Sequence, residues 1–389
     1  MIVLEYKVKV KPHQFIAIDE AIRAAGFCRN KALRYWMDTK GVNGYDLNKY
    51  MAVLAKEFDF ADKLNSMARQ SSAERAWYGI KRFFDNCKKQ VSGKKGYPKF
   101  KKQHRSVEYK TCGWKLIDSK TINFTDGFNI GKVKLIGTRD LNSYDPKLIK
   151  RVRIVRRADG YYCQFCIQID RKESPCVNSS TIGIDVGLEY FYTDSNGNTV
   201  ENPRLLRKSE RKLKKLQRRF SKTKKGSNRR NKARKRLAKK HLQVSRQRKD
   251  FVVKTARALV QTNSLVVYED LQVRNMVKNH NLAKSISDAS WSMFTDWIDY
   301  YVKVFGSHAV AVAPHYTSQQ CSNCGVIVKK SLSTRTHTCS CGCVLHRDHN
   351  AAITILNKGL NTLGHSEIKA QGQNNLCVLD VSLNHKLAG

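Results

Sequence analysis

The stretch 181-TIGIDVGLEYFYTDSNGNTV-200 determines how the rest of the chain is interpreted. Thr181 to Ile184 form an apolar, strand-like run that ends on a carboxylate, Asp185. A second β-rich run follows, and 194-DSNG-197 predicts a hairpin turn, because Asn and Gly tolerate the positive φ that such turns require. A carboxylate at the end of a buried strand is unfavourable unless something compensates it, usually a divalent cation. Asp185 is therefore a candidate metal ligand.

Two further acids occupy comparable positions. The run 264-SLVVYED-270 predicts a buried strand that ends at Glu269, and 346-HRDHNAAITIL-356 predicts a helix that starts at Asp348, where the helix dipole favours a carboxylate. A long helical stretch separates the first hairpin from the second strand, which is the crossover that a parallel pair requires. Parallel pairing would place Asp185 and Glu269 at one edge, within reach of Asp348. Alternatively, these three are ordinary members of the 32 acidic residues.

Asp, Glu and Asp on strand, strand and helix resemble the carboxylate set of RNase H-like nucleases of the RuvC type. Two metal ions held by such acids would activate a water molecule and stabilise the leaving oxygen of a phosphodiester.

The composition restricts the partners of the chain. Its 389 residues predict two or three domains, and 73 Lys and Arg against 32 acids give a net charge of +41. Such a surplus opposes folding unless a polyanion neutralises it, so nucleic acid is the expected partner, with strongly salt-dependent binding. The sequence shows no signal peptide and no apolar run long enough to span a bilayer, so we expect no membrane partner and a cytoplasmic, nucleoid-associated protein of a prokaryote.

The N-terminal part predicts a helical bundle inserted into a β domain. Residues 2–10 alternate as a strand, residues 12–90 show helical spacing with a basic face, and residues 106–170 contain strand runs, including a hairpin from 150 to 170. The first strand is expected to join this sheet, which could close into a barrel. Cys163 and Cys166 spell C-x-x-C on a strand, where positions three apart point to opposite faces, so we expect no metal there.

Two basic segments are candidate nucleic-acid contacts. Residues 91–105 interleave aromatic side chains with lysines, which suits phosphates and stacked bases or, alternatively, a solvated linker. Residues 207–249 are about half Lys and Arg and break at 226–228, which predicts a helical hairpin with a narrow apolar seam and cationic outer faces. The candidate contacts are Lys94, Lys95, Tyr97, Lys99, Arg218, Arg219, Arg229, Arg230, Arg234 and Lys235.

Cysteines gather near the C-terminal end. The run 321-CSNCG-325 is followed by 339-CSCGC-343, and paired thiolates on short loops suit one tetrahedral, structural zinc ion. The expected ligands are Cys321, Cys324, Cys339 and Cys341, with Cys343 as an alternative to one of the last two. Residues 271–290 are polar and predict irregular structure, a helix and a core strand (308–313) follow them, and residues 361–389 predict a flexible tail.

Four motifs in this order, 183-GIDVG-187, 268-YEDL-271, 317-TSQQCSNCG-325 and 347-RDHNAA-352, resemble the TnpB (OrfB) family encoded by insertion sequences, which is similar to the type V CRISPR effector nucleases. The resemblance extends from the first strand to about residue 360. It implies an RNA-guided, Mg²⁺-dependent DNA endonuclease. A guide RNA from the end of the element would pair with double-stranded DNA beside a short adjacent motif, and a single RuvC-like site would cut it.

The resemblance also implies a multidomain α+β organisation. Asp185, Glu269 and Asp348 match the catalytic, Mg²⁺-binding triad. Residues 1–11 with 95–177 would form a β-barrel-like wedge domain, and 12–94 an inserted helical recognition lobe. An RNase H-like (RuvC) α/β domain would span 178–315 and 344–362, a zinc ribbon that binds target nucleic acid 316–343, and a flexible tail 363–389.

One departure from the family concerns the last motif, which commonly reads Asp-Arg-Asp where this chain has His346-Arg347-Asp348. The final acid is kept, so activity is still expected, but His346 and the shortened second cysteine cluster put the local metal geometry in question. Three other functions remain open: an unguided, structure-selective RuvC-like nuclease, a catalytically silent RNA-guided DNA-binding protein, and a zinc-ribbon DNA-binding protein.

Overall fold

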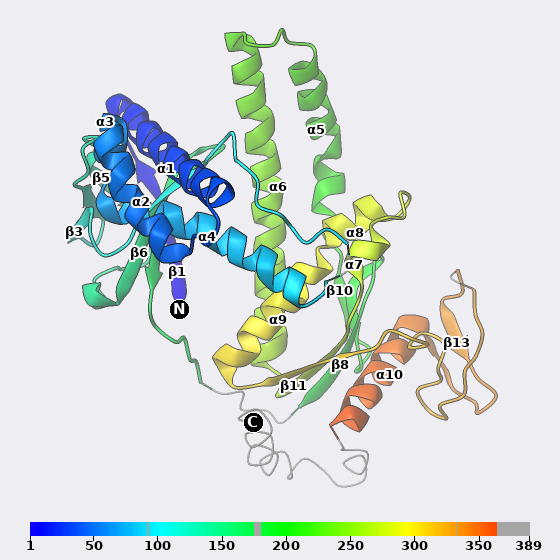
Figure 1. Ribbon diagram of the computed structural model, residues 1–389. Coiled ribbons are helices and arrows are strands. Elements are labelled where there is room, and N and C mark those ends of the chain that lie inside the picture. The colour runs from blue at the N-terminus through cyan, green and yellow to red at the C-terminus, as the bar shows by residue number, and fades with distance from the viewer. Residues whose placement is uncertain (92, 175–179, 332, 364–389) are drawn as a thin grey trace. The chain divides into compact units, whose positions relative to one another are not determined.

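The chain forms two compact units, Met1–Arg171 and Lys172–Gly389. The computed structural model describes residues 1–91, 93–174, 180–331 and 333–363 (Figure 1). Both units contain helices and strands, so the predicted multidomain α+β organisation is confirmed. The tail predicted for 363–389 lies outside the described residues from 364 on.

The first unit contains a seven-stranded antiparallel sheet in the order β2-β6-β7-β1-β5-β4-β3. As predicted, the N-terminal strand joins this sheet, with Leu4 opposite Phe165 and Val8 opposite Leu135. The predicted hairpin is present, since Arg157 pairs with Gly160 at its tip. Strands β2 and β3 are its two edges among the described residues, so the sheet is open where the sequence suggested a barrel. The strands are β1 (Ile2–Lys9), β2 (Ser106–Tyr109), β3 (Trp114–Asp118), β4 (Thr121–Phe124), β5 (Gly131–Ile136), β6 (Ile149–Arg157) and β7 (Gly160–Ile167).

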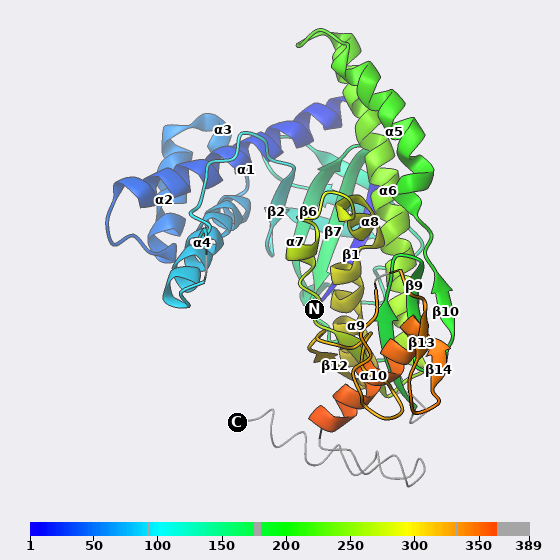
Figure 2. The ribbon, with the colours of Figure 1, turned by 90° about the vertical axis from the view of Figure 1, so that its right-hand side faces the viewer.

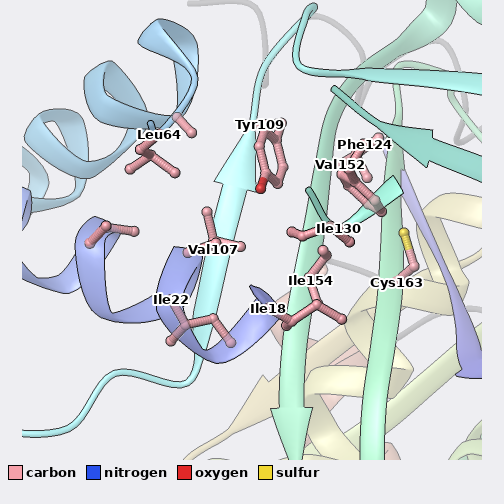
Figure 3. Close-up of a cluster of buried hydrophobic side chains, with 14 of the residues drawn as sticks. Ile18, Ile22, Leu64, Val107, Tyr109, Phe124, Ile130, Val152, Ile154 and Cys163 are labelled. Atoms are coloured by element: carbon pink, nitrogen blue, oxygen red, sulfur yellow. The ribbon is translucent and has the colours of Figure 1, made fainter. Parts of the chain in front are cut away.

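Helices inserted between β1 and β2 pack on this sheet. They are α1 (Pro12–Asp38), α2 (Gly44–Glu57), α3 (Asp59–Asp62) and α4 (Ser66–Lys88). Figure 3 shows Ile18 and Ile22 of α1 in one cluster with Val107 of β2 and Ile154 of β6, all buried. Cys163 also lies in this core at 0 % exposure, and burial raises the pKa of its thiol. It is therefore a packing residue.

The second unit is built on a five-stranded mixed sheet in the order β10-β9-β8-β11-β12. Its strands are β8 (Thr181–Val186), β9 (Tyr190–Asp194), β10 (Thr199–Glu201), β11 (Leu265–Glu269) and β12 (His308–Val312). Strand β11 is parallel to β8 and to β12, as the long crossover predicted, whereas β8, β9 and β10 are antiparallel neighbours. The predicted hairpin turn 194–197 joins β9 to β10, and Gly197 has a φ of 87° there.

Helices α5 (Leu205–Ser221) and α6 (Asn228–Gln261) form the crossover as a hairpin (Figure 2). An apolar seam is present as predicted, and its buried members are Leu213, Leu237 and Val244. The prediction for 271–290 was wrong, because α7 (Val273–Met276) and α8 (Ala283–Ala289) occupy it. Their short length and polar composition hide the helical period. Helix α9 (Trp291–Phe305) packs on α6, and helix α10 (Arg347–Thr362) ends the described chain. Among the described residues, no helix is both long and apolar enough to cross a membrane.

Two glycines allow α10 to lie against the sheet. A Cβ on Gly183 of β8 would come within 2.3 Å of the Ala352 carbonyl oxygen, and a Cβ on Gly359 of α10 within 2.5 Å of Val267 Cγ1. Neither glycine has a positive φ, so the requirement is space and not backbone conformation. These contacts bring the N-terminal end of α10 to the edge where β8 and β11 end.

Candidate active site and metal centre

The first two candidate acids lie side by side at the edge of the second sheet. Strands β8 and β11 are parallel with Ile184 opposite Tyr268, so the next residues along them, Asp185 and Glu269, are neighbours. Both side chains are half-buried. The register therefore produces the juxtaposition that the two apolar runs predicted.

These acids lie in an environment that disfavours negative charge. Burial raises the pKa of Asp185 well above its usual range, and the carboxylates of Glu269 and Asp348 raise it further, while Arg347 opposes the shift. Burial also raises the pKa of Glu269, against the opposing effects of the Thr317 hydroxyl and Lys358. Mutual repulsion of this kind is relieved when a cation is bound among the carboxylates.

The third acid, Asp348, is placed by the first turn of α10. It is 8 % exposed, and the imidazole of His346 caps the helix by accepting a hydrogen bond from the Asp348 amide at 3.3 Å. A histidine thus serves here as an N-cap, so the departure from Asp-Arg-Asp leaves the helix start intact. The Asp348 carboxylate accepts from Arg347 Nε at 2.9 Å and lies 3.8 Å from Arg335 Nη1.

The sequence did not predict that Thr317 lies beside this site. It is 4 % exposed, and its hydroxyl donates to Glu269 Oε1 at 2.5 Å. The only available signal was its place at the start of 317-TSQQCSNCG-325, a motif that is otherwise explained by its cysteines. Arg335 was also missed, since it stands in a polar Ser- and Thr-rich stretch that carries no motif.

The cysteines form a cluster beside α10. The sulfur atoms of Cys321, Cys324, Cys339 and Cys341 all lie within 4.8 Å of one another, so this set could hold a metal ion. Cys321 and Cys341 are 3.7 Å apart, and Cys324 and Cys339 are 3.5 Å apart. Four thiolates around tetrahedral zinc, with bonds of about 2.3 Å, are separated by roughly 3.8 Å. The donor set and spacing therefore fit zinc, and Cys343 lies outside this group.

The segment that carries these cysteines docks on α10 through Asn350. This side chain is 0 % exposed, accepts from the Ser322 amide at 2.9 Å and donates to the Gln320 carbonyl at 2.8 Å. The hairpin of β13 (Thr336–Thr338) and β14 (Val344–His346) leads directly into α10 (Figure 2). Hydrogen bonds thus connect the cysteine cluster to α10, the helix that carries Asp348.

Asn350→Ala is expected to lower the free energy of unfolding of this region by about 2 kcal/mol, because the Ser322 amide loses its acceptor and the Gln320 carbonyl keeps only the Thr354 hydroxyl at 3.3 Å. Hydrogen exchange at the Ser322 amide would measure the loss. Asn357→Ala is the matched control on the same helix, since its amide only reaches the Ser322 carbonyl at 3.5 Å. Equal effects of the two substitutions would contradict the role given to Asn350.

The basic candidates in the helical hairpin divide into two groups. Arg218, Arg219, Arg229, Arg234 and Lys235 are exposed. Arg230 instead closes the hairpin, since its guanidinium donates to the Phe220 and Thr223 carbonyls at 3.2 and 2.6 Å and lies over the Phe220 ring.

The basic loop of the first unit is likewise divided. Lys94 and Lys99 are exposed, whereas Lys95 donates to the Val91 carbonyl. Tyr97 is half-exposed, and its ring packs against Trp36 and Phe83. The free lysines suit phosphates, and the packed residues fix the shape of the loop.

The second unit contains a cavity of about 370 Å³. Arg204, Arg207, Lys284 and Arg335 line it together with Glu189 and Asp288. Arg335 links this cavity to the site, because it pairs with Glu189 at 3.1 Å as well as approaching Asp348.

Comparison with known proteins gives two family matches. Residues 164–280 match the family described as "Probable transposase" (OrfB_IS605), and residues 291–355 match the Cas12f1-like TNB domain. The chain is 39% identical over 184 residues to a "Putative RNA-guided DNA endonuclease" of Streptomyces pristinaespiralis, an alignment that covers 47% of this chain and 46% of that protein. It is 27% identical to "Putative RNA-guided DNA endonuclease InsQ" of Escherichia coli K12, over 71% of this chain and 72% of that protein.

Among solved structures, the fold is similar to that of Cas12f1 in the structure of its complex with sgRNA and target DNA. The TM-score is 0.56 at 14% identity, over 88% of this chain and 82% of that chain. At that identity the likeness concerns the fold alone. The chain spans about half the length of the Streptomyces relative that it matches.

Proposed function

We propose that the chain is a member of the TnpB (OrfB) family of insertion-sequence proteins and an RNA-guided, Mg²⁺-dependent DNA endonuclease. The observation that carries the proposal is the meeting of Asp185, Glu269 and Asp348 from β8, β11 and α10 at one sheet edge. We assign the mixed sheet with its crossover helices to the RNase H-like (RuvC) class, because the acids follow the strands in the order that this class uses.

By donor type, the three acids suit a hard divalent cation. Carboxylate oxygens are the ligands that Mg²⁺ prefers, and a half-buried, mutually repelling set gains most from a cation. Asp185, Glu269 and Asp348 would hold it, and this all-oxygen set disfavours softer metals because it contains no Cys or His. Bound Mg²⁺ would supply charge stabilisation for an in-line displacement at phosphorus.

The surrounding residues orient this carboxylate set. Thr317 fixes the rotamer of Glu269 with a hydrogen bond, and Arg347 holds Asp348 in the absence of a cation. Arg335, with Arg204, Arg207 and Lys284, provides guanidinium and ammonium groups for the phosphates of a strand that enters the cavity. The zinc held by Cys321, Cys324, Cys339 and Cys341 would fix the segment that carries Thr317 and Arg335.

Guide RNA and double-stranded DNA are the proposed partners. The net charge of +41 supplies sequence-independent affinity for both, and base pairing between RNA and DNA supplies the choice of target. We assign residues 1–11 with 95–177 to a wedge domain and 12–94 to a recognition lobe. The nuclease domain would span 178–315 and 344–362, with the ribbon at 316–343. The E. coli and Streptomyces relatives, both named as RNA-guided DNA endonucleases, support RNA and DNA as the partners.

Thr317→Val is expected to raise the Mg²⁺ concentration for half-maximal cleavage by about tenfold, because the carboxylate of Glu269 loses the donor that orients it. Initial cleavage rates over a Mg²⁺ titration would measure the shift. Thr317→Ser keeps the hydroxyl and should restore the wild-type value. A serine variant as impaired as the valine variant would assign the effect to packing of the γ-methyl group.

Sequencing of co-purified RNA tests the function directly. The chain is expressed with its native flanking DNA, washed at high salt, and its bound RNA is sequenced. One defined transcript that ends in flanking sequence is expected, and DNA matching that flank should be cut when Mg²⁺ is present. Bulk RNA that washes away with salt would favour the unguided nuclease. A defined RNA with specific DNA binding but no cleavage would favour the silent RNA-guided binder.

A further inference from the structure

Cys343 and His337 lie beside the four-cysteine set without belonging to it. The sulfur atoms of Cys321 and Cys343 and a ring nitrogen of His337 all lie within 4.8 Å of one another. Cys321 therefore belongs to both groups. Once a tetrahedral ion has taken Cys321, Cys324, Cys339 and Cys341, two further metal ligands remain against the same thiolate.

His337 is the feature that a packing role leaves unexplained. It is 0 % exposed on β13, and its Nδ1 is contacted by Lys330 Nζ. Its Nε2 is buried and has no hydrogen-bond partner among the described residues. An unpaired buried polar atom of this kind costs about 1–3 kcal/mol of folding free energy, so we expect His337 Nε2 to bind a ligand.

The charge around this position favours a cation. A zinc ion with four thiolates carries a net charge of about −2, and Cys343 would add another thiolate. The Lys330 ammonium interacts electrostatically with Cys321, Cys343 and Cys339, so it provides positive charge at the cluster. Lys330 is half-buried and long enough to turn toward solvent, which would free His337.

We infer that Cys321, His337 and Cys343 form a second divalent-metal site, fused to the first through the Cys321 thiolate. Two sulfur ligands and one imidazole select Zn²⁺ over Mg²⁺, with water as the fourth ligand. On binding, Cys343 would lose its thiol proton to solvent, the ring proton of His337 would move from Nε2 to Nδ1 as Lys330 turns away, and Nε2 would bind the metal.

This site would act on the chain just before Asp348. His337 is on β13, opposite Leu345 of β14, and Cys343 directly precedes β14. A metal that joins both to Cys321 would fasten this hairpin to the first cysteine loop. Because β14 ends at His346, the N-cap of α10, the same ion would reduce the freedom of the segment that places Asp348.

Metal stoichiometry of the full-length protein tests the inference without reference to cleavage. The chain is saturated with Zn²⁺, freed of excess metal by gel filtration, and its zinc is measured by mass spectrometry. Two equivalents are expected for the wild type, and one for Cys343→Ser and for His337→Gln. Cys112→Ser, which removes an exposed cysteine of the first unit, is the matched control and should keep two. A Co²⁺ titration should show two spectral phases in the wild type and only the first in these variants, which also shows that their first site is intact.

One equivalent in the wild type would overturn the second site. If that single ion survives in Cys341→Ser and is lost when Cys343→Ser is added, Cys343 is a substitute ligand of the first site. Two equivalents that persist in both Cys343→Ser and His337→Gln would likewise overturn the assignment, because the second ion would then lie elsewhere.

Discussion

Asp185→Asn is expected to lower the single-turnover rate of guided DNA cleavage by about 10³-fold, or roughly 4 kcal/mol of activation free energy. The amide keeps the shape of the side chain and removes the charge that attracts the cation. Binding of guide RNA and DNA should survive, since it depends on the lysines and arginines. A gel-shift assay beside a cleavage time course at saturating Mg²⁺ separates the two.

The matched control is Asp194→Asn on the neighbouring strand. Asp194 is also buried, but it accepts hydrogen bonds from the amides of Asn196 and Asn198 at 2.9 Å and so stabilises the turn after β9. Its replacement should lower stability and leave cleavage of the folded fraction unchanged. Full cleavage by Asp185→Asn would contradict the proposed site.

Asp185→Asn should raise the stability of the metal-free chain, although it lowers the rate of cleavage. The fold raises the pKa of Asp185, so it favours the neutral acid. That contribution is fully present below the unfolded pKa of about 3.9 and is lost as the pH rises toward the folded pKa. Near pH 7, Asp185→Asn should therefore raise the melting temperature by about 3 °C. Mg²⁺ should raise that of the wild type and leave the variant nearly unchanged. An equal Mg²⁺ shift in both would place the cation elsewhere.

The placement of the first two acids could be predicted because strand patterns and crossover rules act locally. Apolar runs ending in Asp185 and Glu269, separated by two helices, leave few alternatives to a parallel pair, and the register agrees. The cysteine loops could also be predicted, because the motif C-x-x-C-G is typical of a turn that can hold a metal ion. The short helices in 271–290 were missed, because a run such as Val273–Met276 is too short to show a period.

The contacts that hold the site together could not be predicted, because they join side chains to distant backbone. Nothing in the spacing of Asn350 shows that it faces Gln320 and Ser322, nor that Arg230 folds back on Phe220. Such hydrogen bonds depend on how closely two elements pack, and individual small residues set the distance between those elements. Gly183 is the clearest case, since 183-GIDVG-187 looks like a strand interrupted by glycine for a turn.

Gly183→Ala is expected to destabilise the second unit by about 3 kcal/mol and to remove cleavage with it. The new Cβ would lie 2.3 Å from the Ala352 carbonyl oxygen and 2.7 Å from the Leu356 backbone nitrogen, and neither belongs to a flexible side chain. Helix α10 must therefore move away from β8, and Asp348 moves with it. Urea unfolding followed by the fluorescence of Trp291 and Trp297, both in this unit, would measure the loss.

Two other glycines make this a graded test. In Gly359→Ala the new Cβ meets Val267 Cγ1 at 2.5 Å, and because a side chain can yield further than backbone, we expect a smaller loss. Gly79→Ala in α4 meets nothing within 4 Å and should stabilise the chain by up to about 1 kcal/mol. A neutral Gly183→Ala would contradict the close packing of α10. If the packing is correct, Gly183→Ala lowers both stability and cleavage, because it moves the helix that carries Asp348. Asp185→Asn lowers cleavage alone, because it removes a charge from an intact fold.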